Sequence, residues 1–216
     1  MKLYSGPLSM FGAKTEIAVR EKGVAVDVEH VPFALTTLYE PKHPDVARIN
    51  PKQQVPVLID GDLELFDSTQ IFEYLEDLKP DPPLWPRDRR ARARARLLEL
   101  KSDEVFFPNV VLLMPRQRAL ASEAQAAEAV GAIHAFYEEM ERVLDGKEYL
   151  AGAFSYADIA FFMAQFFAGF LGASMPSTHA RLGAWRARVG GRESVRQVTG
   201  AMVQFLKKHG LSVAAR

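Results

Sequence analysis

Val55 and Pro56 are the residues of this sequence that most clearly indicate ligand chemistry. Residues 55–59 are branched and apolar and precede an Asp60–Gly61 turn, which predicts a buried strand. Because proline has no N–H to donate, Pro56 predicts an open edge where this strand begins. A trans Val55–Pro56 bond is commoner in proteins, but the context favours cis. A cis bond would turn the backbone N–H and C=O of Val55 toward a peptide-like ligand.

A second polar group, Asp67 and Ser68, follows about ten residues later along the chain. These two residues precede an amphipathic run over residues 69–78, which predicts a helix. Side-chain oxygens and unpaired backbone N–H groups at a helix start form a natural site for a carboxylate. The sequence therefore predicts a peptide-binding edge together with an anion site.

The composition limits the possible classes of function. The 216 residues allow one large or two small domains, and 48% hydrophobic with 25% charged residues is typical of a soluble globular protein. A formal net charge of zero argues against a large nucleic-acid or anionic-membrane footprint. The chain has no cysteine, which excludes disulfides and enzyme thiols and fits a reducing compartment. The N-terminus lacks the apolar core of a signal peptide, and uncharged residues 159–175 predict a core helix rather than a membrane span.

The elements that must position these groups follow the order strand, helix, strand, helix, hairpin, helix. We expect them at residues 2–5, 11–23, 24–31, within the irregular stretch 33–49, at 55–59 with 63–66, and at 69–78. Four prolines among residues 79–86 then predict a linker, since proline cannot continue a helix. Beyond it we expect only helices. Residues 87–114 are expected to form either one long helix kinked at Pro108 or two helices, with a stop at Pro115. Further helices are expected at 121–144, after 154, at 179–189 and at 195–209.

This arrangement resembles the cytosolic glutathione transferases. In the first half the resemblance is carried by Asn50–Pro51, Val55–Pro56, Asp67–Ser68 and Glu73–Tyr74–Leu75. In the second half it is carried by Tyr149–Leu150–Ala151–Gly152 and by Ser155–Tyr156–Ala157–Asp158, which has the spacing of a helix capping box. The resemblance implies an α/β, thioredoxin-like N-terminal domain at residues 1–79, a linker at 80–88 and an all-α C-terminal helical domain at 89–216. We interpret Asp158 as structural rather than catalytic.

The resemblance also implies an activity, in which glutathione is bound as co-substrate and its thiol attacks a small hydrophobic electrophile. Ser9 lies in the region of the catalytic serine of the zeta-like and theta-like classes. The alternative for Ser9 is that it only caps the first helix. Tyr4 and Ser5 are reserve candidates, and Lys14 would add positive potential but is more often a solvated lysine.

The remaining site residues are also assigned by this resemblance. The residues expected to bind glutathione are Lys42, Gln54, Val55, Pro56, Asp67 and Ser68. Phe11, Phe106 and Val110 are expected to line the electrophile site, although their apolar stripe is equally well explained as core. No metal is expected.

The expected partners are glutathione, the electrophile and a second copy of the chain in a homodimer. We expect a cytoplasmic protein with a role in detoxification, and neither nucleic acid nor membrane as partner. The basic run at residues 87–96 is interpreted as a solvated face or a dimer contact. Three alternatives stay open: glutathione-dependent cleavage of β-aryl ethers, which the bacterial β-aryl etherases perform, a glutathione-dependent isomerisation, and a non-catalytic binding or scaffold protein.

Overall fold

The computed structural model describes residues 1–211 and divides into two compact units. The first unit comprises the first 83 residues together with the last helix, α10 (Glu193–Lys208). The second unit comprises residues 84–192. The contacts thus group α10 with the start of the chain, whereas the sequence analysis assigned it to the helical domain.

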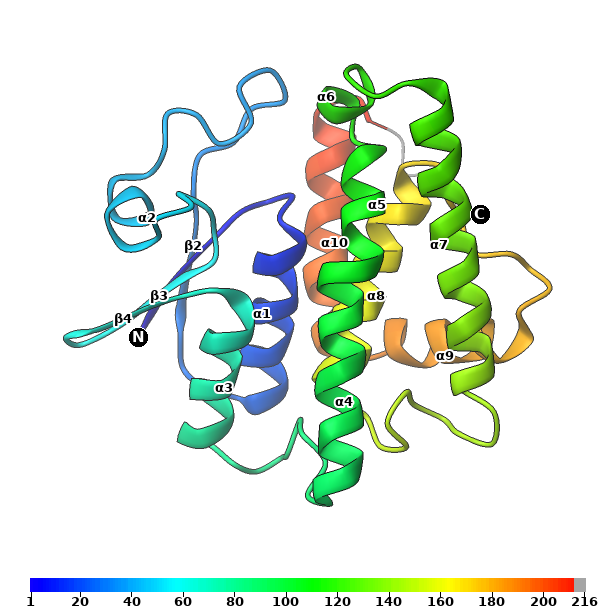
Figure 1. Cartoon of the computed structure of the whole chain (residues 1–216). Helices are drawn as coiled ribbons and strands as arrows, with labels where there is room; N and C mark the ends of the chain where they lie inside the picture. Colours follow the sequence, from blue (N-terminus) through cyan, green and yellow to red (C-terminus); the bar gives the residue numbers. More distant parts are fainter. Residues whose placement is uncertain (212–216) are drawn as a thin grey trace. The chain divides into compact units, whose positions relative to one another are not determined.

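The first unit contains a mixed four-stranded sheet with the order β2-β1-β3-β4 (Figure 1). The strands are β1 (Lys2–Ser5), β2 (Asp27–His30), β3 (Val57–Asp60) and β4 (Leu63–Phe66). β1 pairs with β2 in parallel and with β3 antiparallel, and β3 pairs antiparallel with β4. Gly61 turns the hairpin at a φ of 61°, which glycine adopts without steric cost. The predicted order of elements along the chain is confirmed, although β2 and β3 begin later than expected.

Helices cover both faces of this sheet because successive side chains of a strand point to opposite faces. On one face Leu3 and Leu58 pack with Ile71 of α3 (Ser68–Leu78) and Val19 of α1 (Met10–Lys22). On the other face Tyr4 and Val57 pack with Val46 of α2 (Pro44–Ile49). Leu75 of α3 is also buried on the face that packs against α1. The thioredoxin-like arrangement therefore has two separate apolar layers.

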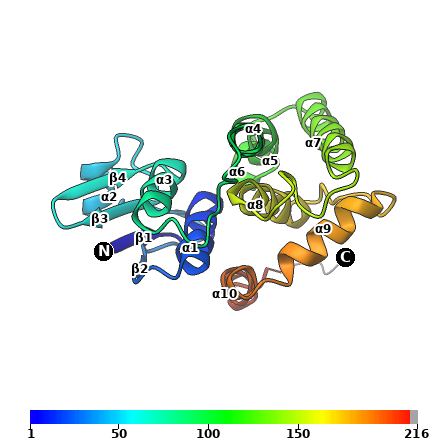
Figure 2. The same cartoon turned by 90° about the horizontal axis from the view of Figure 1, so that it is seen from below.

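Helix α10 packs against α1, and Figure 2 shows the two helices as neighbours. The Arg20 guanidinium donates to the side-chain oxygen of Gln197 at 3.2 Å, and the Ser194 hydroxyl donates to Glu21. Gly23 ends α1 in the left-handed conformation, at a φ of 57°, as the sequence predicts. The sheet-facing helix α1 is thereby enclosed on a second side by the last helix.

All the named elements within residues 84–192 are helices, joined by loops that include two isolated β-bridges. Its helices are α4 (Arg89–Lys101), η1 (Ser102–Phe106), α5 (Phe107–Leu112), α6 (Pro115–Arg118), α7 (Glu123–Val143), α8 (Tyr156–Phe170) and α9 (Ala180–Gly190). The kink predicted at Pro108 is a π-helical turn, η1, immediately before it. Pro108 lacks an N–H and its ring clashes with the carbonyl four residues earlier, so the helix widens there. The helical run ends at Leu112, shortly before the predicted stop at Pro115, where the separate short helix α6 begins.

The start of α8 is organised by the buried carboxylate of Asp158, which is 0% exposed. It accepts hydrogen bonds from the backbone N–H groups of Leu150 and Ser155, both at 2.9 Å. It also accepts from the Ser155 hydroxyl at 2.9 Å and the Trp185 indole at 2.8 Å. Burial raises the pKa of Asp158, and these hydrogen bonds oppose that rise. The structural interpretation of this capping box is confirmed.

The basic run lies mainly on the exposed surface of α4. Arg89, Arg90 and Arg94 are exposed, while the Arg92 guanidinium donates to the carbonyl of Pro86 at 2.9 Å. Within residues 1–211, no helix has the length and apolar character to cross a bilayer. Over the same residues, no cluster of three histidine or acidic side chains is arranged to hold a metal ion.

Candidate functional site

The N-terminal turns of α1 and α3 lie next to each other in the first unit. Figure 1 shows the two helices side by side, and both begin at the same end of the unit. The Lys14 ammonium in the second turn of α1 lies 3.5 Å from the Thr69 hydroxyl in the first turn of α3, which joins the two helix starts directly. Each helix start carries partial positive charge from the aligned peptide dipoles of the helix. Two such ends with a lysine between them make this region favourable for anions.

The start of α3 has an unusual backbone at Asp67. This residue has a φ of 75°, in a region that residues other than glycine rarely adopt. One carboxylate oxygen caps the helix by accepting from the N–H groups of Thr69 at 3.0 Å and Gln70 at 3.2 Å. The second oxygen makes no hydrogen bond to the described residues, so it can accept from a ligand. Ser68 follows as the first helical residue and is 3% exposed.

The peptide bond between Val55 and Pro56 is cis, as the sequence analysis predicts. Pro56 is buried and Val55 is half-buried at the entrance to β3. The loop before them is held by Asn50, which is 4% exposed and donates to the Gln54 carbonyl at 2.6 Å. The other side-chain atom of Asn50 accepts from the Lys52 N–H at 2.9 Å. A buried amide thus fixes the backbone that precedes the proposed edge.

Ser9 is the N-cap residue of α1. Its hydroxyl oxygen accepts a hydrogen bond from the Gly12 N–H at 3.0 Å. The capping role is therefore real, but it uses only the oxygen and leaves the hydroxyl hydrogen able to donate. Capping and thiolate stabilisation are compatible in this geometry, because one orients the oxygen and the other uses the proton.

The two reserve candidates donate elsewhere. The Tyr4 hydroxyl lies in the core and donates to the Asp45 carboxylate at 2.6 Å, which raises the pKa of Tyr4. The Ser5 hydroxyl, which is 0% exposed, donates to the Glu16 carboxylate at 2.6 Å. Of the three hydroxyl residues in this region, Ser9 alone keeps its proton available in the described structure.

Lys14 differs from its prediction as a solvated lysine, because its side chain is 0% exposed. Its ammonium also lies 5.6 Å from the centre of the Phe11 ring. The signal was present in the helical spacing: Lys14 lies four residues after Met10 and four before Ala18, both of which are buried. A buried lysine ammonium needs hydrogen-bond acceptors, and the Thr69 hydroxyl at the start of α3 is one of them.

The remaining predicted residues have mixed environments. The Lys42 ammonium pairs with the Glu40 carboxylate at 3.1 Å on the surface. Phe11 is half-buried, whereas Phe106 and Val110 are 1% and 0% exposed. Phe106 packs against the rings of Phe136, Tyr137 and Phe161 in the second unit. Phe106 and Val110 therefore pack in the core, and of the three electrophile candidates only Phe11 has surface available.

Together the fold and this region define a thioredoxin-like unit with an anion-binding end, followed by a helical unit. A family model described as the N-terminal domain of glutathione S-transferase matches residues 1–77. A second model, described as the C-terminal domain of glutathione S-transferase, matches residues 105–193. The chain belongs to the glutathione S-transferase family, and the resemblance stated from the sequence is confirmed.

Individual relatives carry two kinds of name. A stringent starvation protein A homolog from Coxiella burnetii is 36% identical over 135 residues, which are 60% of this chain and 61% of the relative. Glutathione S-transferase Z2 from Arabidopsis thaliana is 40% identical over 93 residues, 43% of this chain and 40% of the relative. Each match spans less than two thirds of the relative's own length. The crystal structure of a glutathione S-transferase domain-containing protein from Marinobacter aquaeolei VT8 has a TM-score of 0.79 at 25% identity, over 90% of this chain and 100% of that one.

Proposed function

We propose that this protein is a glutathione transferase that binds glutathione at the adjoining starts of α1 and α3 and activates its thiol. The observation that carries the proposal is the contact between Lys14 and Thr69, which joins two helix N-termini at one end of the unit. Glutathione has two carboxylates and reacts as a thiolate, so three of its groups carry negative charge when it reacts. A region that concentrates positive potential from two helices suits such a ligand.

Ser9 is proposed to stabilise the thiolate. A free thiol has a pKa near about 8.5, and lowering it by one unit requires about 1.4 kcal/mol of preferential stabilisation. A hydrogen bond to a charged group contributes about 1.5–3 kcal/mol, which is enough for a shift of one to two units. The Ser9 oxygen is already oriented by the Gly12 N–H at 3.0 Å. Its hydroxyl proton would then point at the sulfur without further ordering.

The other groups of glutathione match the remaining predicted residues. Ser68 and the start of α3 would bind the γ-glutamyl carboxylate, with the Lys14 charge nearby. The unbonded oxygen of Asp67 would accept from the γ-glutamyl ammonium. The Val55 backbone, beside Pro56, would pair with the cysteinyl residue in the manner of a β-strand. The glycine carboxylate would bind Gln54 and Lys42, which requires Lys42 to leave its surface pair with Glu40.

The electrophile and the assembly belong to the same proposal. A small hydrophobic electrophile would contact Phe11, which is half-buried. A homodimer is supported by apolar side chains on the surface of the second unit: Leu97, Leu100 and Val105 are each between 52% and 55% exposed. A cytoplasmic location and a role in detoxification follow from the family's usual setting.

A second candidate is a glutathione-transferase-like protein that binds partners without catalysis. The observation that favours it is the name of several relatives, such as the stringent starvation protein A homolog, which is not the name of a transferase. A panel of electrophiles distinguishes the candidates. Conjugation of a generic aromatic electrophile supports the transferase, turnover of only ether or isomerisable substrates replaces conjugation by those reactions, and no turnover despite glutathione binding supports the non-catalytic protein.

Calorimetry of glutathione binding tests the site itself. We expect Ser68→Ala to weaken binding roughly ten- to a hundredfold, because a hydrogen bond to a charged carboxylate is lost. Ser122→Ala is the matched control, since Ser122 caps α7 in the second unit and is predicted to touch no ligand. Equal affinities of wild type and Ser68→Ala would place the carboxylate elsewhere. No heat of binding at millimolar glutathione would overturn the proposal as a whole.

A further inference from the structure

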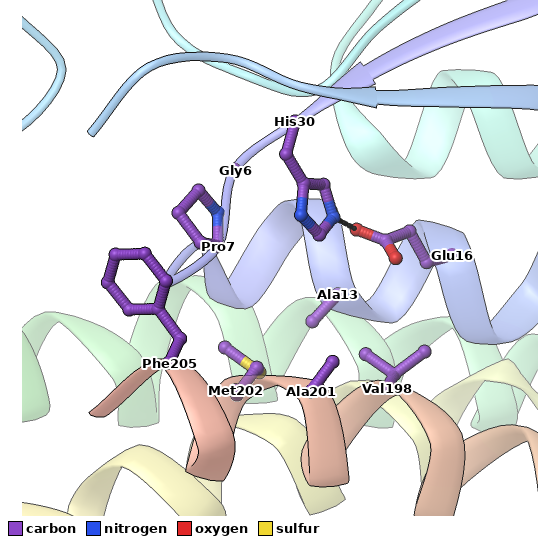
Figure 3. Close-up of a pocket in the computed structure, with 9 residues that line it drawn as sticks. All are labelled: Gly6, Pro7, Ala13, Glu16, His30, Val198, Ala201, Met202 and Phe205. Carbon is purple, nitrogen blue, oxygen red and sulfur yellow. Dashed lines mark hydrogen bonds and ion pairs between the residues drawn. The ribbon is translucent and has the colours of Figure 1, made fainter. Parts of the chain in front are cut away.

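A pocket separate from the proposed glutathione groups lies between α1, the end of β2 and α10, all in the first unit (Figure 3). Its volume is about 80 Å³. Most of its wall is apolar, and the list of these lining residues is Gly6, Pro7, Ala13, Val198, Ala201, Met202 and Phe205. Two polar residues, Glu16 and His30, complete the lining. None of the residues proposed above to bind glutathione or the electrophile lines this pocket.

The Glu16 carboxylate is the unusual group in this wall because it is 5% exposed. One oxygen accepts both from the Ser5 hydroxyl at 2.6 Å and from the His30 ring at 2.9 Å. The second oxygen has no partner among the described residues, and Figure 3 shows it directed toward α10. A carboxylate oxygen without a protein partner in a largely apolar wall gives the pocket one hydrogen-bond acceptor for a donating ligand.

Gly12 allows α1, which carries the Glu16 carboxylate, to lie close to β1. A Cβ at Gly12 would lie 2.3 Å from the Ser5 hydroxyl oxygen, so glycine permits Ser5 to sit against α1. Ser5 is thereby fixed where its proton reaches one oxygen of Glu16. The close approach of β1 to α1 therefore fixes the orientation of the Glu16 carboxylate and the position of its second oxygen.

We propose that this pocket binds a small primary alkylammonium ion. The ammonium would donate to the free oxygen of Glu16, and a short alkyl chain would lie against Val198 and Met202. A cation is favoured over a neutral donor because the carboxylate is buried, where charge–charge attraction is screened less than in water. An anion is disfavoured by the same carboxylate. The His30 side chain is 41% exposed, so the pocket opens to solvent at that residue.

His30 makes this binding depend on pH. Its hydrogen bond with Glu16 raises the pKa of His30, so the imidazolium persists above its ordinary range and neutralises the carboxylate. The other titratable groups around it are Arg20 on α1, Tyr39 beside Gly6, and His209, which stacks on Phe205 at 4.2 Å. Burial raises the pKa of Tyr39 above its ordinary value of about 10, so Tyr39 stays neutral between pH 6 and 9. Alkylammonium affinity should therefore increase as His30 loses its proton.

The test compares three probes of one size, n-butylammonium, 1-butanol and butanoate, on the full chain. Chemical shifts of backbone amides in residues 12–16 and 198–205 measure binding at pH 6 and pH 9, with and without saturating glutathione. We expect n-butylammonium to bind roughly ten- to a hundredfold more tightly than 1-butanol at pH 9, and more weakly at pH 6. Glutathione should leave this affinity unchanged.

Two variants and one control assign the site. Glu16→Gln should remove the preference for ammonium over alcohol, and Ala201→Leu should abolish binding of both by filling the pocket from its exposed edge. Glu29→Gln, a neighbour of His30 that does not line the pocket, should change neither. Equal affinity for the three probes, preference for butanoate, retention of the preference in Glu16→Gln, displacement by glutathione, or no binding at millimolar probe would each overturn the proposal. If Glu16→Gln does not fold, Ala201→Leu and the probe series still decide.

Discussion

Replacing Ser9 by alanine separates its two proposed roles, capping α1 and stabilising the thiolate. The structure gives Ser9 one hydrogen bond as acceptor, from the Gly12 N–H at 3.0 Å. Loss of such a cap costs about 1 kcal/mol of unfolding free energy. The proposed bond to the thiolate is separate from that loss, because it uses the hydroxyl proton.

The magnitude for catalysis follows from that second bond. Removing a hydrogen bond to a charged group costs about 1.5–3 kcal/mol, which raises the pKa of bound glutathione by roughly one to two units. At a pH below both pKa values, the thiolate fraction and the conjugation rate fall roughly ten- to a hundredfold. Above the raised pKa the thiol ionises unaided, and the rates of wild type and Ser9→Ala should converge. Glutathione affinity should change little, because the other contacts remain.

The assay is a pH–rate profile of conjugation to a generic aromatic electrophile. Ser9→Gly is the informative second variant, since glycine at an N-cap costs only a few tenths of a kcal/mol relative to serine. It keeps the helix start almost intact and removes the hydroxyl. Ser122→Ala, which removes the cap of α7, controls for loss of a cap elsewhere.

Overlapping profiles of wild type, Ser9→Ala and Ser9→Gly would refute the role of Ser9 in thiol activation. The backbone N–H groups of Met10 and Phe11 would then be the donors to examine. A slower conjugation rate in Ser9→Ala together with a wild-type profile in Ser9→Gly would also refute this role. The whole effect would then come from the loss of the helix cap.

Three further predictions concern charged side chains. Asp158→Ala should lower the unfolding free energy by about 2–5 kcal/mol in urea denaturation, because it leaves buried donors unpaired; a loss under about 1 kcal/mol would contradict the capping network. His30→Gln should destabilise the protein below pH of about 6.5 and hardly at pH 9: pairing with Glu16 raises the pKa of His30, so its stabilisation is complete below the unfolded-state pKa and is lost as pH rises through the folded-state value. An equal loss at both pH values would count against the pair. Lys14→Met should weaken glutathione binding about tenfold in calorimetry on a variant checked for folding by circular dichroism, and unchanged affinity would remove Lys14 from the anion site.

The order of elements could be predicted because it depends on local patterns. The Asp60–Gly61 turn, the stop of α1 at Gly23 and the capping box at Ser155 each involve residues within a few positions of one another. Such local signals depend little on how the elements pack against one another. The π-helical turn before Pro108 was seen as a kink only, since the sequence locates the break but not how the helix absorbs it.

The site was less predictable because its geometry joins distant segments. Lys14 and Thr69 meet across 55 positions of sequence, so the buried role of the lysine depends on how α1 and α3 pack. The Glu16–His30 pair likewise requires α1 to lie against the end of β2. For Phe106 and Val110 the sequence predicted burial but not the correct environment. An apolar stripe on a helix predicts burial, but not whether it faces a ligand or the core.

The grouping of α10 with the first unit bears on how the chain is made. Residues 84–192 form a continuous unit, whereas the first unit is interrupted and completed only by a helix near the C-terminus. During synthesis from the N-terminus, the side of α1 that packs against α10 stays uncovered until residues 193–208 have left the ribosome. The helical unit can therefore finish folding before the sheet-containing unit that precedes it. Deleting residues 193–208 would therefore destabilise the sheet-containing unit although the deleted residues lie far from it in sequence.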